Sequence, residues 1–83
     1  MAEVKIYTTK ICPYCVAAKK LLESKGVEYQ EIDLTGDEKS LQELKAQTGM
    51  QTVPQIFING ELIGGCDELH KLNATGELDK MLS

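Results

Sequence analysis

Arginine is absent from this chain of 83 residues, and nine lysines stand against thirteen acidic side chains, which leaves a net charge of −4. Nucleic-acid phosphates are bound by basic faces, so this charge balance argues against nucleic acid as the main partner. Long apolar runs are also missing, and none approaches the ~20 residues that a membrane-spanning helix needs. We therefore expect neither a nucleic-acid partner nor a membrane.

The amino-terminal residues 1–4 lack the basic segment and long apolar run of a secretory signal, so we expect a cytoplasmic location. The short length leaves room for one hydrophobic core, and we expect residues 1–83 to form a single domain. Only three cysteines are present. In a reducing compartment, a close pair of cysteines is more often catalytic or metal-binding than part of a structural disulfide.

The first part of the chain predicts a strand, a helix and a second strand. Residues 4–7 alternate in the manner of a strand. Apolar residues recur at helical spacing from residue 13 to about residue 25, and Gly26 favours a helix end there. Residues 27–34 again resemble a strand. Their alternation slips within residues 29–32, which indicates a bulge or an early start.

A second helix is predicted after residue 35. Thr35 and Glu38 have the spacing of a capping box, in which two side chains bind the free N–H groups at a helix start. Leu41 and Leu44 share one face of this helix, which we expect to end near residues 48–49.

The last part of the chain predicts a hairpin and helices. Asn59-Gly60 is a strong two-residue turn signal between strands at 55–58 and 61–63. A helix follows from about Asp67, with a final turn holding Leu78. Strand–helix–strand, helix, hairpin and helix together predict an α/β fold, a four-stranded mixed sheet flanked by helices on both faces.

Cys12-Pro13-Tyr14-Cys15 lies where the first strand gives way to the first helix. The first N–H groups of a helix lack internal partners, and the helix dipole adds partial positive charge, so a thiolate is stabilised there. Pro13 suits the first turn because its missing N–H would have no partner. Cys15 lies one helical turn after Cys12, close enough to form a small disulfide ring.

Two further short motifs follow Cys12-Pro13-Tyr14-Cys15 along the chain: Thr52-Val53-Pro54 and Gly64-Gly65-Cys66-Asp67. With them the chain resembles a dithiol glutaredoxin of the small bacterial type, over essentially its whole length. The resemblance implies a thioredoxin fold and a glutathione-dependent thiol–disulfide oxidoreductase. It also implies a cis peptide bond between Val53 and Pro54.

The resemblance implies that Cys12 is the nucleophile and Cys15 the resolving thiol. It implies no metal and no tightly bound cofactor, with glutathione as co-substrate, disulfide-containing or glutathionylated proteins as partners, and a monomer. We expect a set of polar, aromatic and backbone contacts to hold glutathione: Lys10, Tyr14, Thr52, Val53, Pro54, Gly65, Cys66 and Asp67.

Two positions depart from the family pattern. Thr9 stands where the family often has lysine, and Leu41 where it commonly has arginine or glutamine for the glycyl carboxylate, with Gln42 beside it. Lys19 and Lys20 are interpreted as a solvated helix face, with a screened influence on the thiols.

Other interpretations of the cysteines stay open. Cys66 contributes either packing and backbone contacts or an oxidisable third thiol. Cys12, Cys15, Cys66 and His70 imitate a zinc site weakly. The rival functions are a redoxin reduced directly by a flavoprotein reductase and a homodimer that holds a [2Fe–2S] cluster through Cys12 and glutathione.

Overall fold

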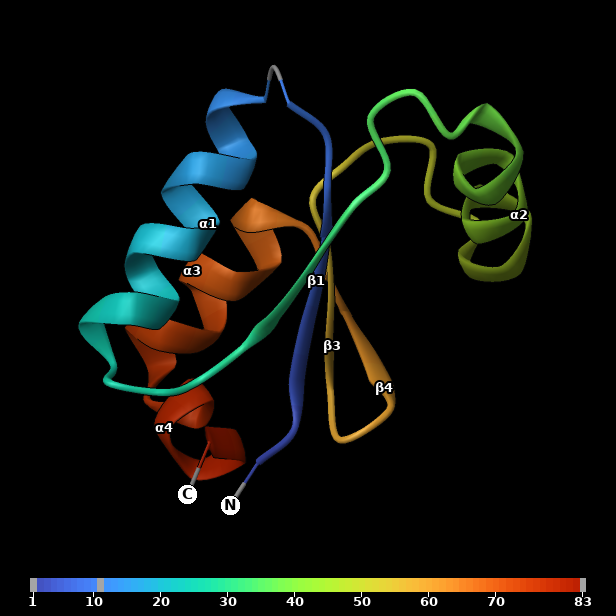
Figure 1. Cartoon of the computed structure of the whole chain (residues 1–83). Helices are drawn as coiled ribbons and strands as arrows, with labels where there is room; N and C mark the ends of the chain where they lie inside the picture. Colours follow the sequence, from blue (N-terminus) through green and yellow to red (C-terminus); the bar gives the residue numbers. More distant parts are fainter. Residues whose placement is uncertain (1, 11, 83) are drawn as a thin grey trace.

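The computed structural model describes residues 2–10 and 12–82. These residues form four strands and four helices (Figure 1). Their order and bounds are β1 (Val4–Thr8), α1 (Pro13–Ser24), β2 (Gln30–Asp33), α2 (Glu38–Thr48), β3 (Gln55–Ile58), β4 (Glu61–Gly64), α3 (Cys66–Thr75) and α4 (Glu77–Leu82).

The strands form one mixed sheet in the order β2-β1-β3-β4. β1 pairs in parallel with β2 and antiparallel with β3, and the β3–β4 hairpin turns at Asn59-Gly60. Figure 1 shows α1 and α3 on one face of the sheet and α2 on the other. This arrangement confirms the predicted mixed sheet with helices on both faces. No helix among the described residues has the length and apolar character to cross a bilayer.

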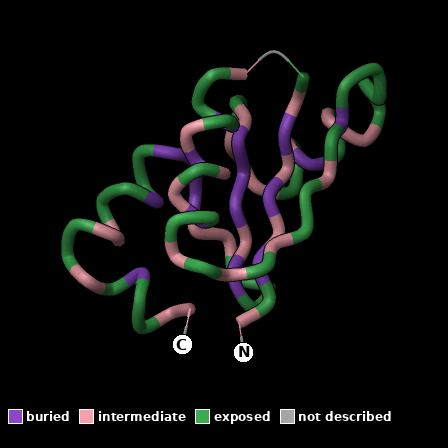
Figure 2. The backbone as a smooth tube through the Cα atoms, turned by 60° about the vertical axis from the view of Figure 1, so that its left-hand side comes forward, coloured by how far each residue is buried: buried purple, intermediate pink, exposed green. Residues whose placement is uncertain are grey.

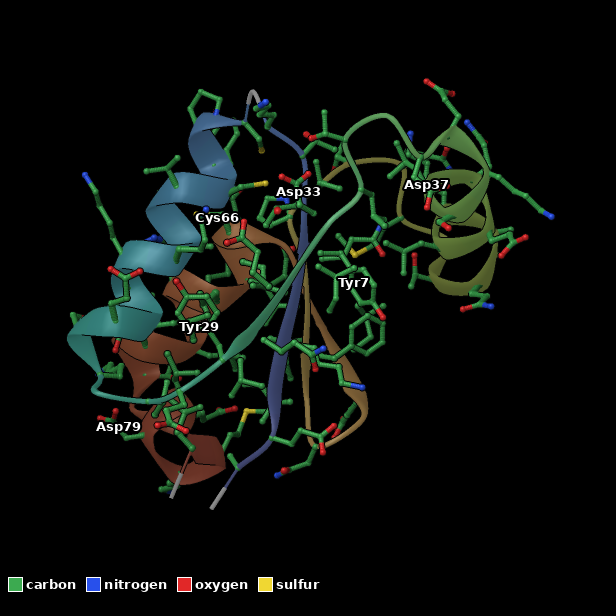
Figure 3. All side chains as sticks on the ribbon, in the orientation of Figure 1. Tyr7, Tyr29, Asp33, Asp37, Cys66 and Asp79 are labelled. Atoms are coloured by element: carbon green, nitrogen blue, oxygen red, sulfur yellow. The ribbon has the colours of Figure 1, made fainter. Side chains whose placement is uncertain are left out.

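The core lies between the sheet and the layer formed by α1 and α3. Side chains on β1 alternate, with Val4, Ile6 and Thr8 buried, and the central strands carry much of the buried backbone in Figure 2. Leu22 of α1 and Leu69 of α3 are fully buried against them. The opposite face carries the edge-to-face pair of Tyr7 and Phe57, with Tyr7 labelled below α2 in Figure 3.

The second strand is shorter than the sequence predicts. β2 begins at Gln30 rather than Val27, and it pairs with β1 from Lys5–Gln30 to Thr8–Asp33 without a break, so the expected bulge is absent from this pairing. The pairing starts at Lys5–Gln30, although β1 itself begins at Val4. Tyr29 therefore lies before the strand, where its hydroxyl donates to Glu23.

The predicted capping box at the start of α2 is wrong. The carboxylate of Asp37, immediately before the helix, accepts the Ser40 N–H at 3.1 Å. Thr35 lies two positions before Asp37, too early in the chain to cap the helix. Its hydroxyl instead accepts the Lys10 N–H at 2.6 Å. The helix ends at Thr48, followed by Gly49 in the left-handed region, as predicted.

The buried position of Leu22 gives a test of the core. We predict that Leu22→Ala lowers the free energy of unfolding by about 2–5 kcal/mol, because a fully buried leucine leaves a cavity. Val16→Ala is the control on the same helix, since Val16 is 47% exposed and its truncation changes stability by about 0.5 kcal/mol or less. Urea titration of both variants checks this, and equal losses would contradict the described packing.

Candidate active site

The fold places Cys12 at the start of α1. Cys12 is the N-cap residue, with an extended backbone (φ −150°, ψ 98°), and Pro13 occupies the first helical position, as predicted. The backbone N–H of Cys15 donates to Cys12 Sγ at 3.2 Å. The helix start thus supplies a hydrogen-bond donor to the first sulfur and brings the second cysteine next to it. Both residues are free thiols in this structure.

The two thiols lie in different environments. Cys12 is partly exposed, whereas Cys15 is only 1% exposed. Burial raises the pKa of Cys15 to about 12, and its hydrogen bond with Cys12 acts in the same direction. A backbone hydrogen bond from Thr9 and the positive charge of Lys19 oppose this rise in the Cys15 pKa. Cys12 is therefore the more accessible of the two sulfurs, and Cys15 is shielded from solvent.

The loop before β3 reaches the active-site thiols. The Cys12 thiol donates to the carbonyl oxygen of Val53 at 3.6 Å, and the Val53–Pro54 peptide bond is cis, as the resemblance implies. Residues 41 positions apart in the chain are thus adjacent in the fold. The backbone of this loop lies beside the Cys12 thiol.

A groove of about 340 Å³ opens between this loop and the start of α3. It is lined by most of the predicted glutathione-binding residues together with two others: Tyr14, Met50, Thr52, Val53, Pro54, Gly65, Cys66, Asp67 and Glu68. Tyr14 is 65% exposed at its edge. The structure therefore brings together three motifs that the sequence holds far apart.

Lys10 is the one predicted contact outside the groove lining. It is exposed, and its backbone N–H binds Thr35 in the loop after β2. Leu41 and Gln42, on α2, also lie outside the lining. The described residues offer no cluster of three or more His, Cys, Asp or Glu side chains arranged to hold a metal ion.

Two groove residues went unrecognised in the sequence. Glu68 accepts the Gly65 N–H at 2.7 Å and so caps the start of α3. Its spacing from the Gly64-Gly65 pair was a signal for this cap, although glycine lacks the usual capping side chain. Met50 follows the end of α2 and its methyl group lies near Gly65, a contact for which the sequence gives no signal.

Gln55 is a third residue that the sequence did not single out. It is fully buried, and its side-chain amide donates to the carbonyl oxygens of Met50 and Thr52 at 3.2 and 3.1 Å. Gln55 thus ties the groove loop to β3. Among the described residues its Oε1 atom is the one buried side-chain oxygen or nitrogen with no hydrogen-bond partner. A polar residue at the start of an apolar strand was the available signal.

Cys66 begins α3 at the rim of the groove and is 8% exposed. Burial is the main cause that raises the pKa of its thiol, and the negative charge of Asp67 adds to this rise. Its contacts belong to the main hydrophobic core. These are the features of a cysteine that packs as a small apolar residue, because a raised thiol pKa limits the reactive thiolate.

Comparison with known proteins identifies the arrangement. The family model described as Glutaredoxin matches residues 4–63. The chain belongs to the glutaredoxin family. Glutaredoxin 3 of Escherichia coli (strain K12) is 51% identical over 82 residues, which span 99% of each chain.

Solved structures of glutaredoxins have the same fold. A solution structure of glutaredoxin from Brucella melitensis matches with a TM-score of 0.87 and 44% identity, over 99% of this chain and 89% of that one. A crystal structure of a buckwheat glutaredoxin–glutathione complex matches with a TM-score of 0.87 and 36% identity, over 98% of this chain and 76% of that one. The mixed sheet is therefore the thioredoxin fold, and the protein is a glutathione-dependent thiol–disulfide oxidoreductase.

The anchoring role of Gln55 leads to a prediction. Gln55→Glu removes the amide donor and places a carboxylate against two carbonyl oxygens, so we expect a loss of about 3 kcal/mol or more in unfolding free energy at pH 7. Burial raises the pKa of the introduced carboxyl, and only its neutral form can donate. The loss is therefore full above that pKa and shrinks as the pH falls through it.

Urea titrations at several pH values measure this loss. Gln51→Glu, four residues earlier and exposed, is the control, and we expect little change from it at any pH. A loss for Gln55→Glu that does not depend on pH would contradict the proposed contact with the two carbonyl groups.

Proposed function

We propose that Cys12 and Cys15 carry the oxidoreductase reaction, with Cys12 as nucleophile and Cys15 as resolving thiol. The observation that supports this division is the difference in exposure between two adjacent sulfurs. Cys12 is partly exposed beside the groove, and Cys15 is almost completely buried behind it. An external disulfide can reach only the first sulfur, whereas the second is placed to attack the first.

In the first step the Cys12 thiolate attacks a substrate disulfide. For a glutathionylated protein, a bond forms between Cys12 Sγ and the glutathione sulfur, while the bond to the protein sulfur breaks. The protein leaves as a thiolate and takes a proton from solvent. No electrons enter or leave at this stage, because thiol–disulfide exchange only moves the disulfide from one pair of sulfurs to another.

Two routes then regenerate the enzyme. In the first, Cys15 attacks Cys12 Sγ, expels the bound thiol and leaves a Cys12–Cys15 disulfide, which glutathione reduces. In the second, external glutathione attacks the mixed disulfide and Cys15 takes no part. Protein disulfides, which leave a large partner on Cys12, need the first route, and glutathionylated proteins are reduced by either.

The groove is proposed to hold the glutathione part of the mixed disulfide. The exposed backbone of Thr52 and Val53 can pair with an extended peptide, and Tyr14 covers one edge. Gly65 keeps the passage open, since a Cβ atom there would lie 3.3 Å from the Pro54 carbonyl oxygen. A glutathione complex has been solved for the buckwheat relative.

The start of α3 is proposed to bind the γ-glutamyl end. The first N–H groups of the helix, at Cys66 and Asp67, suit its carboxylate, and the Asp67 side chain suits its ammonium group. Cys66 acts here through its backbone and its packing. Lys10 is exposed outside the groove, and its long side chain is proposed to attract a substrate carboxylate.

The remaining parts of the proposal concern the whole protein. We propose a single domain over residues 1–83 that works as a monomer in the cytoplasm without a tightly bound cofactor. Its partners are glutathione and disulfide-containing or glutathionylated proteins. The net charge of −4 supports the exclusion of nucleic acid.

Replacing each cysteine separates the two routes. We predict that Cys12→Ser abolishes all activity, because it removes the attacking sulfur. Cys15→Ser is expected to abolish reduction of protein disulfides and to keep reduction of glutathionylated substrates. Steady-state assays with glutathione and glutathione reductase as the electron source measure both reactions.

Cys66→Ser is the matched control, and we expect it to retain both activities. Loss of both activities in folded Cys15→Ser protein would contradict the division of roles. A folded, reduced wild type that is inactive with glutathione, yet active with a flavoprotein reductase, would overturn the glutathione route itself.

The proposed ammonium contact of Asp67 can be tested separately. We predict that Asp67→Asn raises KM for a glutathionylated peptide about fivefold with little change in kcat, because it weakens a charge-assisted hydrogen bond of about 1 kcal/mol made throughout the reaction. Asp79→Asn, on α4 at the far end of the molecule in Figure 3, is the control. An equal KM for both variants would remove Asp67 from the binding site.

A further inference from the structure

Three elements of the fold meet in one hydrogen-bonded cluster. The Glu31 carboxylate on β2 accepts the Thr8 hydroxyl of β1 at 2.8 Å and the Lys19 ammonium of α1 at 3.0 Å, both through Oε2. Thr8 is 1% exposed, and the Lys19 side chain is 26% exposed. Lys19 is therefore anchored against the sheet, which differs from the solvated helix face that the sequence indicated.

Both charges of the pair are stabilised by the cluster. The hydrogen bond from Lys19 is the largest cause that lowers the pKa of Glu31, and the hydrogen bond from Thr8 is the next. The hydrogen bond to Glu31 is the main cause that raises the pKa of Lys19. Lys19 thus stays protonated throughout the pH range in which thiols ionise. Its neighbour Lys20 is exposed and has no contact with this cluster.

Lys19 is also placed to act on the buried thiol. It follows Cys15 by four positions on α1, and residues four apart lie on the same face of a helix, one turn from each other. Thr8, which belongs to the cluster, is followed in the sequence by Thr9, whose backbone forms a hydrogen bond with the Cys15 sulfur. Lys19 and Cys15 therefore approach the same end of β1 from the same side of the helix, and they interact electrostatically.

The resolving reaction makes this placement important. Cys15 must lose its proton to solvent before its thiolate attacks Cys12 Sγ, forms the Cys12–Cys15 bond and expels the glutathione thiolate, which is then protonated by solvent. Burial opposes formation of that thiolate. The positive charge of Lys19 favours it.

We propose that Lys19, held in place by Glu31, is a positioning residue for the resolving step, whose ammonium group stabilises the Cys15 thiolate as it forms. The proposal rests on the role of Cys15 as the resolving thiol. It assigns Lys19 no part in the first attack by Cys12, and so confines the effect to reactions that pass through the internal disulfide.

Other charged and titratable groups surround this region. Cys12, just before α1, opposes ionisation of Cys15, and Glu23 on α1 interacts with Lys19. On β2, Asp33 interacts with Glu31. On α3, the Cys66 thiol interacts with Cys12, and Asp67 and Glu68 act on Cys66. These groups are the same in all the variants below, so they cancel in the comparison.

The test measures closure of the internal disulfide directly. Reduced protein is mixed with excess oxidised glutathione, quenched rapidly with acid at successive times, and analysed by mass spectrometry for the glutathione adduct and for the closed ring. We expect Lys19→Met to slow ring closure about three- to tenfold near neutral pH and to shift the pH dependence of closure to higher pH. Lys19→Arg, which keeps the charge, is expected to restore the wild-type rate to within about twofold.

The matched control is Lys20→Met, which removes the same charge from the adjacent position, and we expect the wild-type rate and pH profile. A second comparison uses the Cys15→Ser background. There the reduction of a glutathionylated peptide is expected to be the same with lysine or methionine at position 19, because that route does not use Cys15.

The outcomes separate the two proposals. If ring closure occurs in wild type but Lys19→Met and Lys20→Met have the same rates and profiles, the role of Lys19 is overturned and that of Cys15 stands. A slowing by Lys19→Met that is uniform with pH and is not restored by arginine also overturns it, as a general structural effect. If the wild type never forms the Cys12–Cys15 ring, the role of Cys15 itself fails.

Discussion

The active site depends on the hydrogen bonding of β1 along both of its edges. Pairing with β2 and β3 puts β1 at the centre of the sheet, and Cys12 follows the end of β1 by four positions, at the start of α1. The same pairing with β3 brings the loop that ends at Pro54 to within hydrogen-bond reach of Cys12. Cys12 and the groove are therefore held in place by the backbone hydrogen bonds of the sheet, which depend little on surface side chains.

Burial then distinguishes two chemically identical residues. Cys12 and Cys15 are separated by one helical turn, yet only the first is open to substrate, because α1 turns the second toward the sheet. Burial raises the pKa of Cys15, and the charge of Lys19, which Glu31 binds together with Thr8, opposes this rise. The geometry suits the proposed reaction, in which Cys12 reacts with the substrate first and Cys15 reacts afterwards.

Local patterns predicted most of the architecture. They failed at the boundaries of two elements, the start of β2 and the cap of α2. The helix of residues 13–24 and the Asn59-Gly60 hairpin are set by nearby residues, and both were predicted. β2 begins only at Gln30, where its pairing with β1 starts, and Asp37 rather than Thr35 caps α2. Neither result is contained in hydrophobic periodicity.

The sequence by itself determined the reaction class, since the two cysteines, the Thr52-Val53-Pro54 loop and the start of α3 can be read from short motifs. The tertiary structure alone decided how these parts act together: which thiol is buried, and which loop faces it. It also showed that Gln55 holds the groove loop and that Lys19 is anchored by Glu31. The physical reason is that burial and ion pairing depend on contacts between residues distant in the chain, whereas a motif records only neighbours.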